Sequence, residues 1–219
     1  HSASGAGAIY SDSSDLVINR CRFLANRTSL DGGAMYVQGA SNSLTVTDSF
    51  FIGNYTTANS NGGGALGLYN LGSVDISGTV FAKNTSEGEG GAIRVDKVTS
   101  MTASYLTFYD NTSSYAGVGN TRGGGAISIY SSSLVNISKS IFWENLADSQ
   151  DRGNNVSIGN LGTCTVNIGN SDIEWDAYLT ANDLGGNIFA DPKFLDVDND
   201  EYNLDPTTTC LDMGAFPII

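Results

Sequence analysis

The sequence predicts an all-β protein folded as a parallel β-helix, or solenoid, of about six to seven coils. Two alternating motifs support this prediction. The first is Gly-Gly-Ala followed by Ile, Leu or Met, at residues 32–35, 63–66, 90–93 and 124–127, with looser copies at 6–9, 153–156 and 185–188. The second is Phe-x-x-Asn, at residues 23–26, 51–54, 81–84, 108–111 and 142–145. The mean repeat of about 30 residues is in the range of stacked repeat architectures.

Each predicted coil begins with a short strand directly after the glycine corner. Apolar residues alternate there with variable ones, as in Met35 and Val37 around Tyr36, which is typical of a strand with one buried face. A second strand leads up to the Phe, as in Leu44 and Val46. Its alternation changes phase before the Phe, which indicates a bend or bulge. Every coil is therefore expected to contain two strands of about five residues and two corners.

Parallel neighbours about 4.8 Å apart would place like residues on like. We expect an inward ladder of aromatic rings at Phe23, Phe51, Phe81, Phe108 and Phe142. We also expect a ladder of amides at a corner, formed by Asn26, Asn54, Asn84, Asn111 and Asn145. Glycine permits the backbone dihedral angles that the other corner needs.

The whole chain, residues 1–219, is predicted to be one domain, with regular coils over about 5–176 and an atypical closing coil over about 177–219. A propeller would need four strands in each blade of roughly 40 residues, which these units are too short to supply. The Leu-x-x-Leu-x-Leu pattern of leucine-rich repeats is missing. The most variable segments lie between each Asn and the next glycine pair, and such insertions map to one side of a solenoid.

The composition restricts the classes of partner. The chain has 23 acidic and 10 basic residues and a net charge of −13, which disfavours nucleic acid and anionic lipid. It has no apolar stretch of about 18 residues, so we expect no membrane insertion. No secretory signal precedes the repeats, as in a mature or truncated product. Of three cysteines, Cys21 is interpreted as a core filler, whereas pairing of Cys164 with Cys210 stays open.

The alternation of Gly-Gly-Ala-Ile with Phe-x-x-Asn resembles the repeats of the chlamydial polymorphic outer membrane proteins. It is also similar to many bacterial surface proteins with right-handed β-helices of the pectate-lyase-like superfamily. The ending resembles the closing coil of that broader family, with Asp-Pro-x-Phe at 191–194, Tyr-x-Leu at 202–204 and Cys-x-Asp-x-Gly-Ala at 210–215. These motifs cover about residues 5–216. The resemblance implies a right-handed helix and an extracellular or cell-surface location, but not catalysis, because the superfamily includes both adhesins and polysaccharide-degrading enzymes.

No catalytic residue is assigned from the sequence. Hydrolysis of polysaccharides needs two or three convergent carboxylates, and no Asp-Asp pair occurs in the sequence. The only histidine is His1. A lyase needs a cationic base near calcium carboxylates; Arg94 and Arg122 are the best placed cations, without an acidic cluster beside them in the sequence. We therefore expect a non-catalytic structural or adhesive protein. A polysaccharide lyase or hydrolase, or a carbohydrate-binding fragment, is the alternative.

Two candidate binding sites remain. Asp196, Asp198, Asp200 and Glu201 have the alternating oxygen ligands of a Ca²⁺ loop but lack the glycine and final glutamate of an EF-hand, and the alternative is a solvated acidic turn. Tyr10 and Tyr36 occupy equivalent outward positions, where stacked aromatic rings either bind sugars or stabilise a sheet face.

Two further features concern the surface and the ends. Six Asn-x-Ser/Thr sequons occur, four of them at ladder asparagines, and we favour the ladder over glycosylation there. The apolar ending Phe216-Pro217-Ile218-Ile219 suggests docking on the first coil of another copy, which would build a head-to-tail filament. Other expected partners are glycans or molecules of a host or cell surface.

Overall fold

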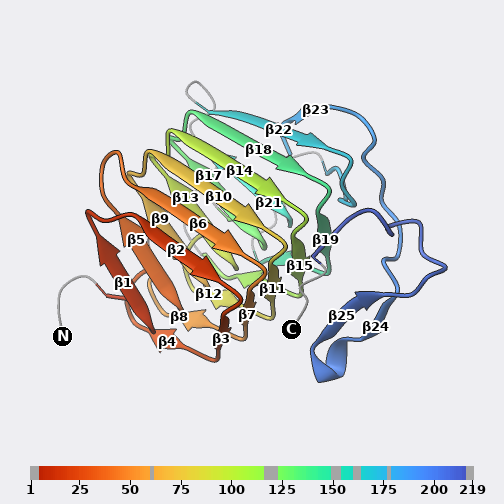
Figure 1. The fold of residues 1–219 in the computed structure, drawn as a ribbon, viewed down its shortest axis with the longest axis horizontal. Helices are drawn as coiled ribbons and strands as arrows, with labels where there is room; N and C mark the ends of the chain where they lie inside the picture. The colour runs from red at the N-terminus through yellow and green to blue at the C-terminus, as the bar shows by residue number, and fades with distance from the viewer. Residues whose placement is uncertain are drawn as a thin grey trace.

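The structure, a computed structural model, describes residues 5–59, 62–115, 123–148, 154–159, 164–176 and 179–215. They form a β-solenoid of stacked parallel strands, which confirms the predicted fold class (Figure 1). Two of the sheets contain five strands each, so the solenoid has about five complete turns and a partial sixth. The expected six to seven coils were therefore slightly too many. The described residues contain no helix with the length and hydrophobicity that a membrane crossing requires.

Two long sheets form the larger walls. Sheet A follows the glycine corners and consists of β1 (Ile9–Asp12), β5 (Met35–Gln38), β9 (Leu66–Tyr69), β13 (Ile93–Asp96), β17 (Ile127–Tyr130) and β21 (Val156–Gly159). Sheet B comes next in each coil and consists of β2 (Leu16–Asn19), β6 (Ser43–Thr47), β10 (Ser73–Ser77), β14 (Ser100–Ser104), β18 (Leu134–Ser138), β22 (Thr165–Gly169) and β23 (Asn182–Asp183).

Two shorter sheets complete each coil. Sheet C carries the phenylalanines and consists of β3 (Arg22–Leu24), β7 (Phe50–Ile52), β11 (Val80–Ala82), β15 (Thr107–Tyr109) and β19 (Ile141–Trp143). Sheet D follows the asparagines and consists of β4 (Arg27–Thr28), β8 (Tyr55–Thr56), β12 (Thr85–Ser86), β16 (Thr112–Ser113) and β20 (Leu146–Ala147). A complete coil thus contains four strands, not two, because the predicted second strand is divided between sheets B and C and a further short strand of sheet D follows the asparagine.

The corners explain both motifs. The third position of Phe-x-x-Asn adopts left-handed backbone geometry, as at Lys83 with φ +56°, and this residue turns the chain from sheet C to sheet D. At the glycine pair, Gly63 has φ +79°. Its neighbour Gly64 approaches the next coil so closely that a Cβ would lie 2.0 Å from the carbonyl oxygen of Gly91. The first glycine is needed for its dihedral angle and the second for the spacing between coils.

The interior is a continuous apolar column with the phenylalanine ladder at its centre. Successive rings from Phe23 to Phe142 stack with centroid distances of 4.6, 5.0, 5.1 and 4.8 Å and interplanar angles no larger than 13°. Phe51, Phe81 and Phe108 have no exposed surface. Each of the three inner rings therefore stacks between two like rings, an arrangement of aromatic side chains that adds to the stability of the core.

The asparagine ladder satisfies the polar groups of the corner. The Asn84 Nδ2 donates to the Phe51 carbonyl at 2.8 Å and to Asn111 Oδ1 at 2.9 Å. Its Oδ1 accepts from the backbone N–H and the Nδ2 of Asn54, both at 2.9 Å. Asn54 and Asn111 make corresponding contacts, and the side chains of all three are buried. An amide that uses both donors and its acceptor in this way stabilises a buried corner.

The closing segment departs from the expected closing coil. After the last coil, β24 (Phe194–Asp196), a 3₁₀ turn (Val197–Asn199) and β25 (Glu201–Leu204) form an antiparallel hairpin (Figure 1). This hairpin lies on the outer face of sheet C, where Tyr202 and Ala215 join a cluster that includes Phe50 and Val80. Residues 191–215 lack the two repeat motifs, and prolines at 192 and 206 cannot donate to a strand ladder. The segment therefore covers outward apolar side chains instead of adding a turn.

The three cysteines are free. Cys21 is partly buried and packs against the core at the first coil. Cys164 and Cys210 do not pair: Cys210 is buried near the closing segment, and its thiol contacts Asp172 Oδ2 at 3.4 Å.

Candidate functional site

The outer face of sheet A carries the first candidate site. Tyr10 of β1 and Tyr36 of β5 are paired in register, and their rings stack with centroids 6.0 Å apart and planes 3° apart. Tyr10 is 39% exposed, and Tyr36 is partly buried. Burial raises the pKa of Tyr36 to about 12, so its phenol stays neutral and can donate a hydrogen bond at neutral pH. The two parallel rings form an aromatic surface that spans two coils as a stack, in which Tyr10 is the more exposed ring.

Polar groups lie beside this aromatic surface. The Gln38 side chain donates to the Tyr10 hydroxyl and to Asp12 Oδ2, each at 3.0 Å. The hydroxyl of Ser13 donates to Asp12 Oδ1, and these hydrogen bonds lower the pKa of Asp12. The carboxylate is therefore ionised and well oriented. Flat rings next to an amide and a carboxylate are suited to a sugar, which has an apolar C–H face and a hydroxyl edge.

Farther along the same outward column, Arg94 is buried within an ion-pair cluster. Gly67 lies between Tyr36 and Arg94, and its lack of a side chain leaves room for the Tyr36 ring, 2.7 Å from where a Cβ would stand. Arg94 pairs with Glu89 Oε2 at 3.2 Å and with Asp96 Oδ2 at 2.9 Å. The sequence analysis missed these carboxylate partners. Arg94 is only 6% exposed and pairs with two carboxylates. These contacts suit a structural role better than the role of a catalytic base. Arg122 lies outside the described residues.

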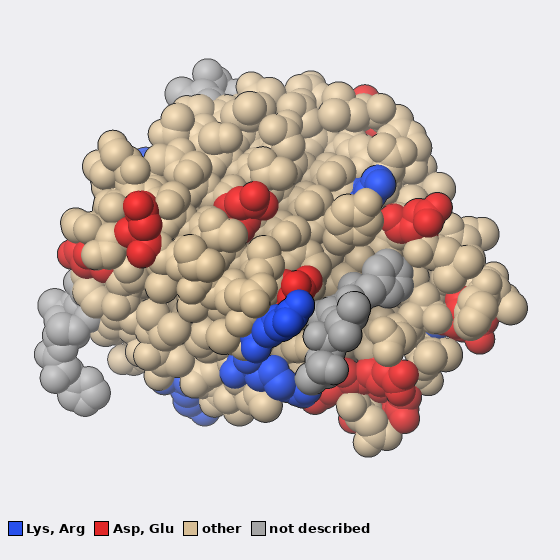
Figure 2. Space-filling model, in the orientation of Figure 1, with Lys and Arg blue, Asp and Glu red and all other residues tan. Residues whose placement is uncertain are grey.

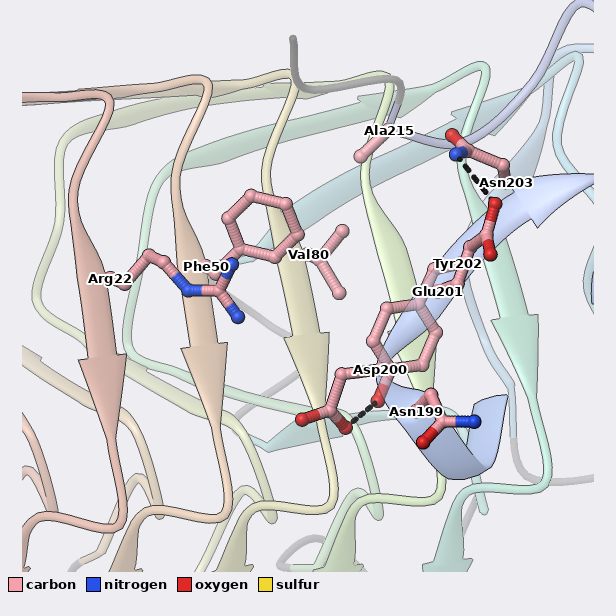
Figure 3. Close-up of a pocket in the computed structure, with 9 residues that line it drawn as sticks. All are labelled: Arg22, Phe50, Val80, Asn199, Asp200, Glu201, Tyr202, Asn203 and Ala215. Atoms are coloured by element: carbon pink, nitrogen blue, oxygen red, sulfur yellow. Dashed lines mark hydrogen bonds between the residues drawn. The ribbon is translucent and has the colours of Figure 1, made fainter. Parts of the chain in front are cut away.

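A second candidate site is a groove of about 310 Å³ between sheet C and the closing hairpin (Figure 3). Its apolar floor consists of Phe50, Val80 and Ala215, and Arg22 stands at one side with its guanidinium 4.9 Å from the centroid of the Phe50 ring. The opposite side is formed by residues 199–203. The sequence analysis did not predict this groove. The doublet Phe50-Phe51 was the available signal, because neighbouring strand residues point to opposite faces.

Ion pairing and burial define the electrostatics of this groove. Lys83 anchors the hairpin by pairing with Asp200 at 3.1 Å and by donating to the Val197 carbonyl at 2.8 Å. The Tyr202 hydroxyl donates to Asp200 Oδ1 at 3.1 Å. Burial, reinforced by the negative charge of Asp200, raises the pKa of Tyr202, so that phenol is neutral at all ordinary pH values.

The four carboxylates predicted to hold Ca²⁺ have separate partners where contacts are described. Asp196 accepts from the backbone N–H and the side chain of Asn199, Asp200 accepts from Lys83, and Glu201 accepts from Asn203. No group of three or more His, Cys, Asp or Glu residues within the described ranges has an arrangement that could hold a metal ion. Calcium binding stays a prediction, to be tested with a chelator.

Charge is unevenly distributed over the surface. Figure 2 shows the molecule from the side of sheet B, where few charged side chains appear and positive groups gather near the lower edge. Three of the ten basic residues, Arg20, Arg22 and Arg27, belong to the first coil. Within the described residues, none of the three takes part in a salt bridge. The first coil of this acidic protein therefore contains three arginines, whose charge is largely balanced by Asp12 and Asp15 of the same coil.

Comparison with known proteins gives one match. Residues 78–96 and 105–130 match the model of the Chlamydia polymorphic membrane protein (Chlamydia_PMP) repeat. Each matched stretch begins at the corner before sheet C and ends with a strand of sheet A, so it covers three of the four strands of one turn. No curated protein and no solved structure matches the chain. The chain is a β-helix protein that resembles the chlamydial polymorphic membrane proteins, and this resemblance indicates a protein of the outer membrane or cell surface.

Proposed function

We propose that this chain is a non-catalytic, extracellular or cell-surface adhesive protein that binds carbohydrate through Tyr10 and Tyr36. The observation that carries the proposal is the stacked, parallel pair of rings on adjacent coils, beside the Gln38 amide and the Asp12 carboxylate. A neutral sugar beside this stack would place its C–H face on the exposed Tyr10 ring and its hydroxyls on the polar pair. The rigid solenoid holds this surface in place before binding, which lowers the entropic cost.

A glycan array tests this proposal. We expect binding to a defined set of glycans, with affinity reduced about tenfold or more by Tyr10→Ala, since an aromatic contact contributes about 1 kcal/mol beyond its buried area. Val17→Ala is the control, because Val17 is an exposed apolar residue of sheet B, away from the site. Equal binding by the two variants, or no binding to any glycan, would refute the role of the tyrosines.

The alternative function is cleavage of a polysaccharide. Arg94 is the feature that favours it, because its two carboxylate neighbours supply the acidic cluster that the sequence analysis did not find. Incubation with a panel of polysaccharides, assayed for reducing ends and unsaturated products, separates the functions. Turnover that is lost in Arg94→Lys would replace the adhesive proposal with the enzymatic one.

A finer hypothesis is that copies stack head to tail. Within the described residues, β1 and β2 pair only on the side of the next coil, so their other edges are open for an additional strand. A heterologous contact of this kind repeats without closing and therefore builds a filament. The expected contact residues 216–219 lie outside the described residues. Electron microscopy at high protein concentration tests the idea, since dispersed single particles would rule it out.

A further inference from the structure

The outer face of sheet C is only partly covered by the closing hairpin. The hairpin is fixed over the later coils, with Gly214 N–H bonded to the Lys139 carbonyl at 2.8 Å and Ala215 N–H bonded to Thr107 Oγ1 at 3.0 Å. Its contacts reach back to Lys83 of the third coil. The first coil extends farther, and Leu24 of β3 remains 50% exposed. A shelf therefore lies beyond the hairpin, formed by Leu24 of β3 and the edge of Phe50 of β7, whose side chain is only 7% exposed.

The strand that borders the groove has one open edge. β25 contributes Glu201, Tyr202 and Asn203 to the lining, whereas β24 contributes no residue to it (Figure 3). In the part of the chain that the structure describes, β25 pairs with β24 alone. Its other edge thus carries backbone N–H and C=O groups without a neighbouring strand, and such an edge is a template for strand addition.

The charges around the groove specify what kind of strand fits. Arg22 has no carboxylate partner among the described residues and lies over the Phe50 ring at the shelf. Arg22 is therefore available to a carboxylate, which a guanidinium binds with two parallel hydrogen bonds. The floor between Arg22 and β25 is apolar, because Phe50 and Val80 are its central residues.

We propose that the groove binds an extended peptide of a partner protein, which adds as a third strand to the open edge of β25. Alternate side chains of an added strand point to one face, so apolar residues at every second position would cover the shelf of Phe50 and Leu24. An acidic residue on the strand pairs with Arg22. Because Asp200 and Glu201 line the opposite side of the groove, further acidic residues would be repelled. The ligand class is therefore an extended peptide with alternating apolar residues and a single carboxylate for Arg22.

A direct binding experiment uses the complete chain and a synthetic probe, the fluorescein-labelled peptide acetyl-Thr-Val-Asp-Val-Thr-Val-amide. We expect saturable binding by fluorescence anisotropy and slower amide hydrogen exchange in residues 201–204 when the peptide is present. Methylation of alternate backbone nitrogens of the peptide should abolish binding, because it removes the strand hydrogen bonds. Full binding by the methylated peptide would overturn strand addition.

The charge requirement is tested with matched variants. Arg22→Gln should weaken binding about tenfold, in line with the loss of a charged hydrogen bond. Arg20→Gln is the control, since Arg20 is an exposed arginine of the same coil that does not line the groove. The probe with Lys in place of Asp should lose affinity to the same extent for the unaltered chain, which makes the test independent of any folding defect. Equal effects of the two arginine variants would overturn the role of Arg22.

The same experiment distinguishes other occupants. Sedimentation of the chain alone measures whether another copy fills the groove. A dimer that dissociates in the Arg22→Gln variant would overturn the proposal that the groove binds a different protein. A chain cut after Ala215 measures competition by the last four residues. If the peptide bound only to this shortened chain, the groove would serve the chain itself and the proposal would fail.

Discussion

Replacement of Asn84 by alanine should destabilise the fold far more than its small size suggests. The substitution removes four hydrogen bonds and leaves two buried groups unsatisfied: the Asn54 N–H and one Asn54 amide hydrogen. Each unsatisfied buried group costs about 1–3 kcal/mol, so we expect a loss of about 3–5 kcal/mol in the free energy of unfolding after some relaxation. The corner has no solvent access through which water would replace the amide, because Asn54 and Asn84 are fully buried.

Asn136 provides a matched control for this measurement. It also bonds to an asparagine of the next coil, Asn167, at 2.8 Å, but on the outer face of sheet B and only partly buried. Since water can replace that bond, Asn136→Ala should cost less than about 1 kcal/mol. Urea unfolding followed by circular dichroism measures both variants. If the two losses agreed within about 0.5 kcal/mol, the measured stability would contradict the reasoning from buried, unsatisfied groups.

Three more predictions concern the core, pH and metal. Phe51→Ala and Phe81→Ala should each lower stability by about 3–5 kcal/mol in the same assay, and a small shift would refute the buried ladder. Burial raises the pKa of Asp172 from 3.8 to about 6, so the folded chain holds this proton more tightly. The resulting stabilisation is present below about pH 4 and is lost, by about 3 kcal/mol, as the pH rises to about 6. Unfolding curves from pH 4 to 8 should show that loss, and Asp172→Asn should remove it; an equal slope in both proteins would be the contrary result. The calcium hypothesis predicts that a chelator lowers the melting temperature and that Asp198→Ala removes this response, whereas an unchanged melting curve in chelator would retire it.

The repeat was predictable from the sequence because the same motifs recur in successive coils. The glycine pairs and the Phe-x-x-Asn motifs each indicate a position in the coil, and parallel stacking follows from their even spacing. The division of the second strand was predicted only as a bend, since residues such as Lys139 adopt left-handed geometry without being glycine. The sequence pattern alone does not identify such corners. Lysine rarely adopts left-handed backbone geometry, and here the packing of the neighbouring coils overrides that local preference.

The position of the closing hairpin and of the groove was not predictable in the same way. Contacts such as that between Lys83 and Asp200 join residues more than a hundred positions apart, and no periodicity relates them. The outward apolar residues Phe50 and Val80 were visible in the sequence, but an alternating pattern does not say what covers them. The partners of Arg94 were not predictable for a related reason. Glu89 precedes the glycine corner and Arg94 follows it in β13, and the turn of the chain at this corner brings the two side chains together.

The hairpin over the later coils also has a consequence for the order in which the molecule comes apart. In a stack of coils, each coil is held by its neighbours, and unravelling starts most easily at an end. Contacts from residues 194–215 bridge the coils around Lys83, Thr107 and Lys139, so those turns cannot separate until the hairpin detaches. Within the described ranges, the second coil contacts the closing residues only through the apolar cluster of Phe50 and Ile52, and the first coil lies beyond these contacts. Opening should therefore progress from the amino-terminal coils inward, and amide protection should rise along the solenoid axis toward the turns that the hairpin clamps.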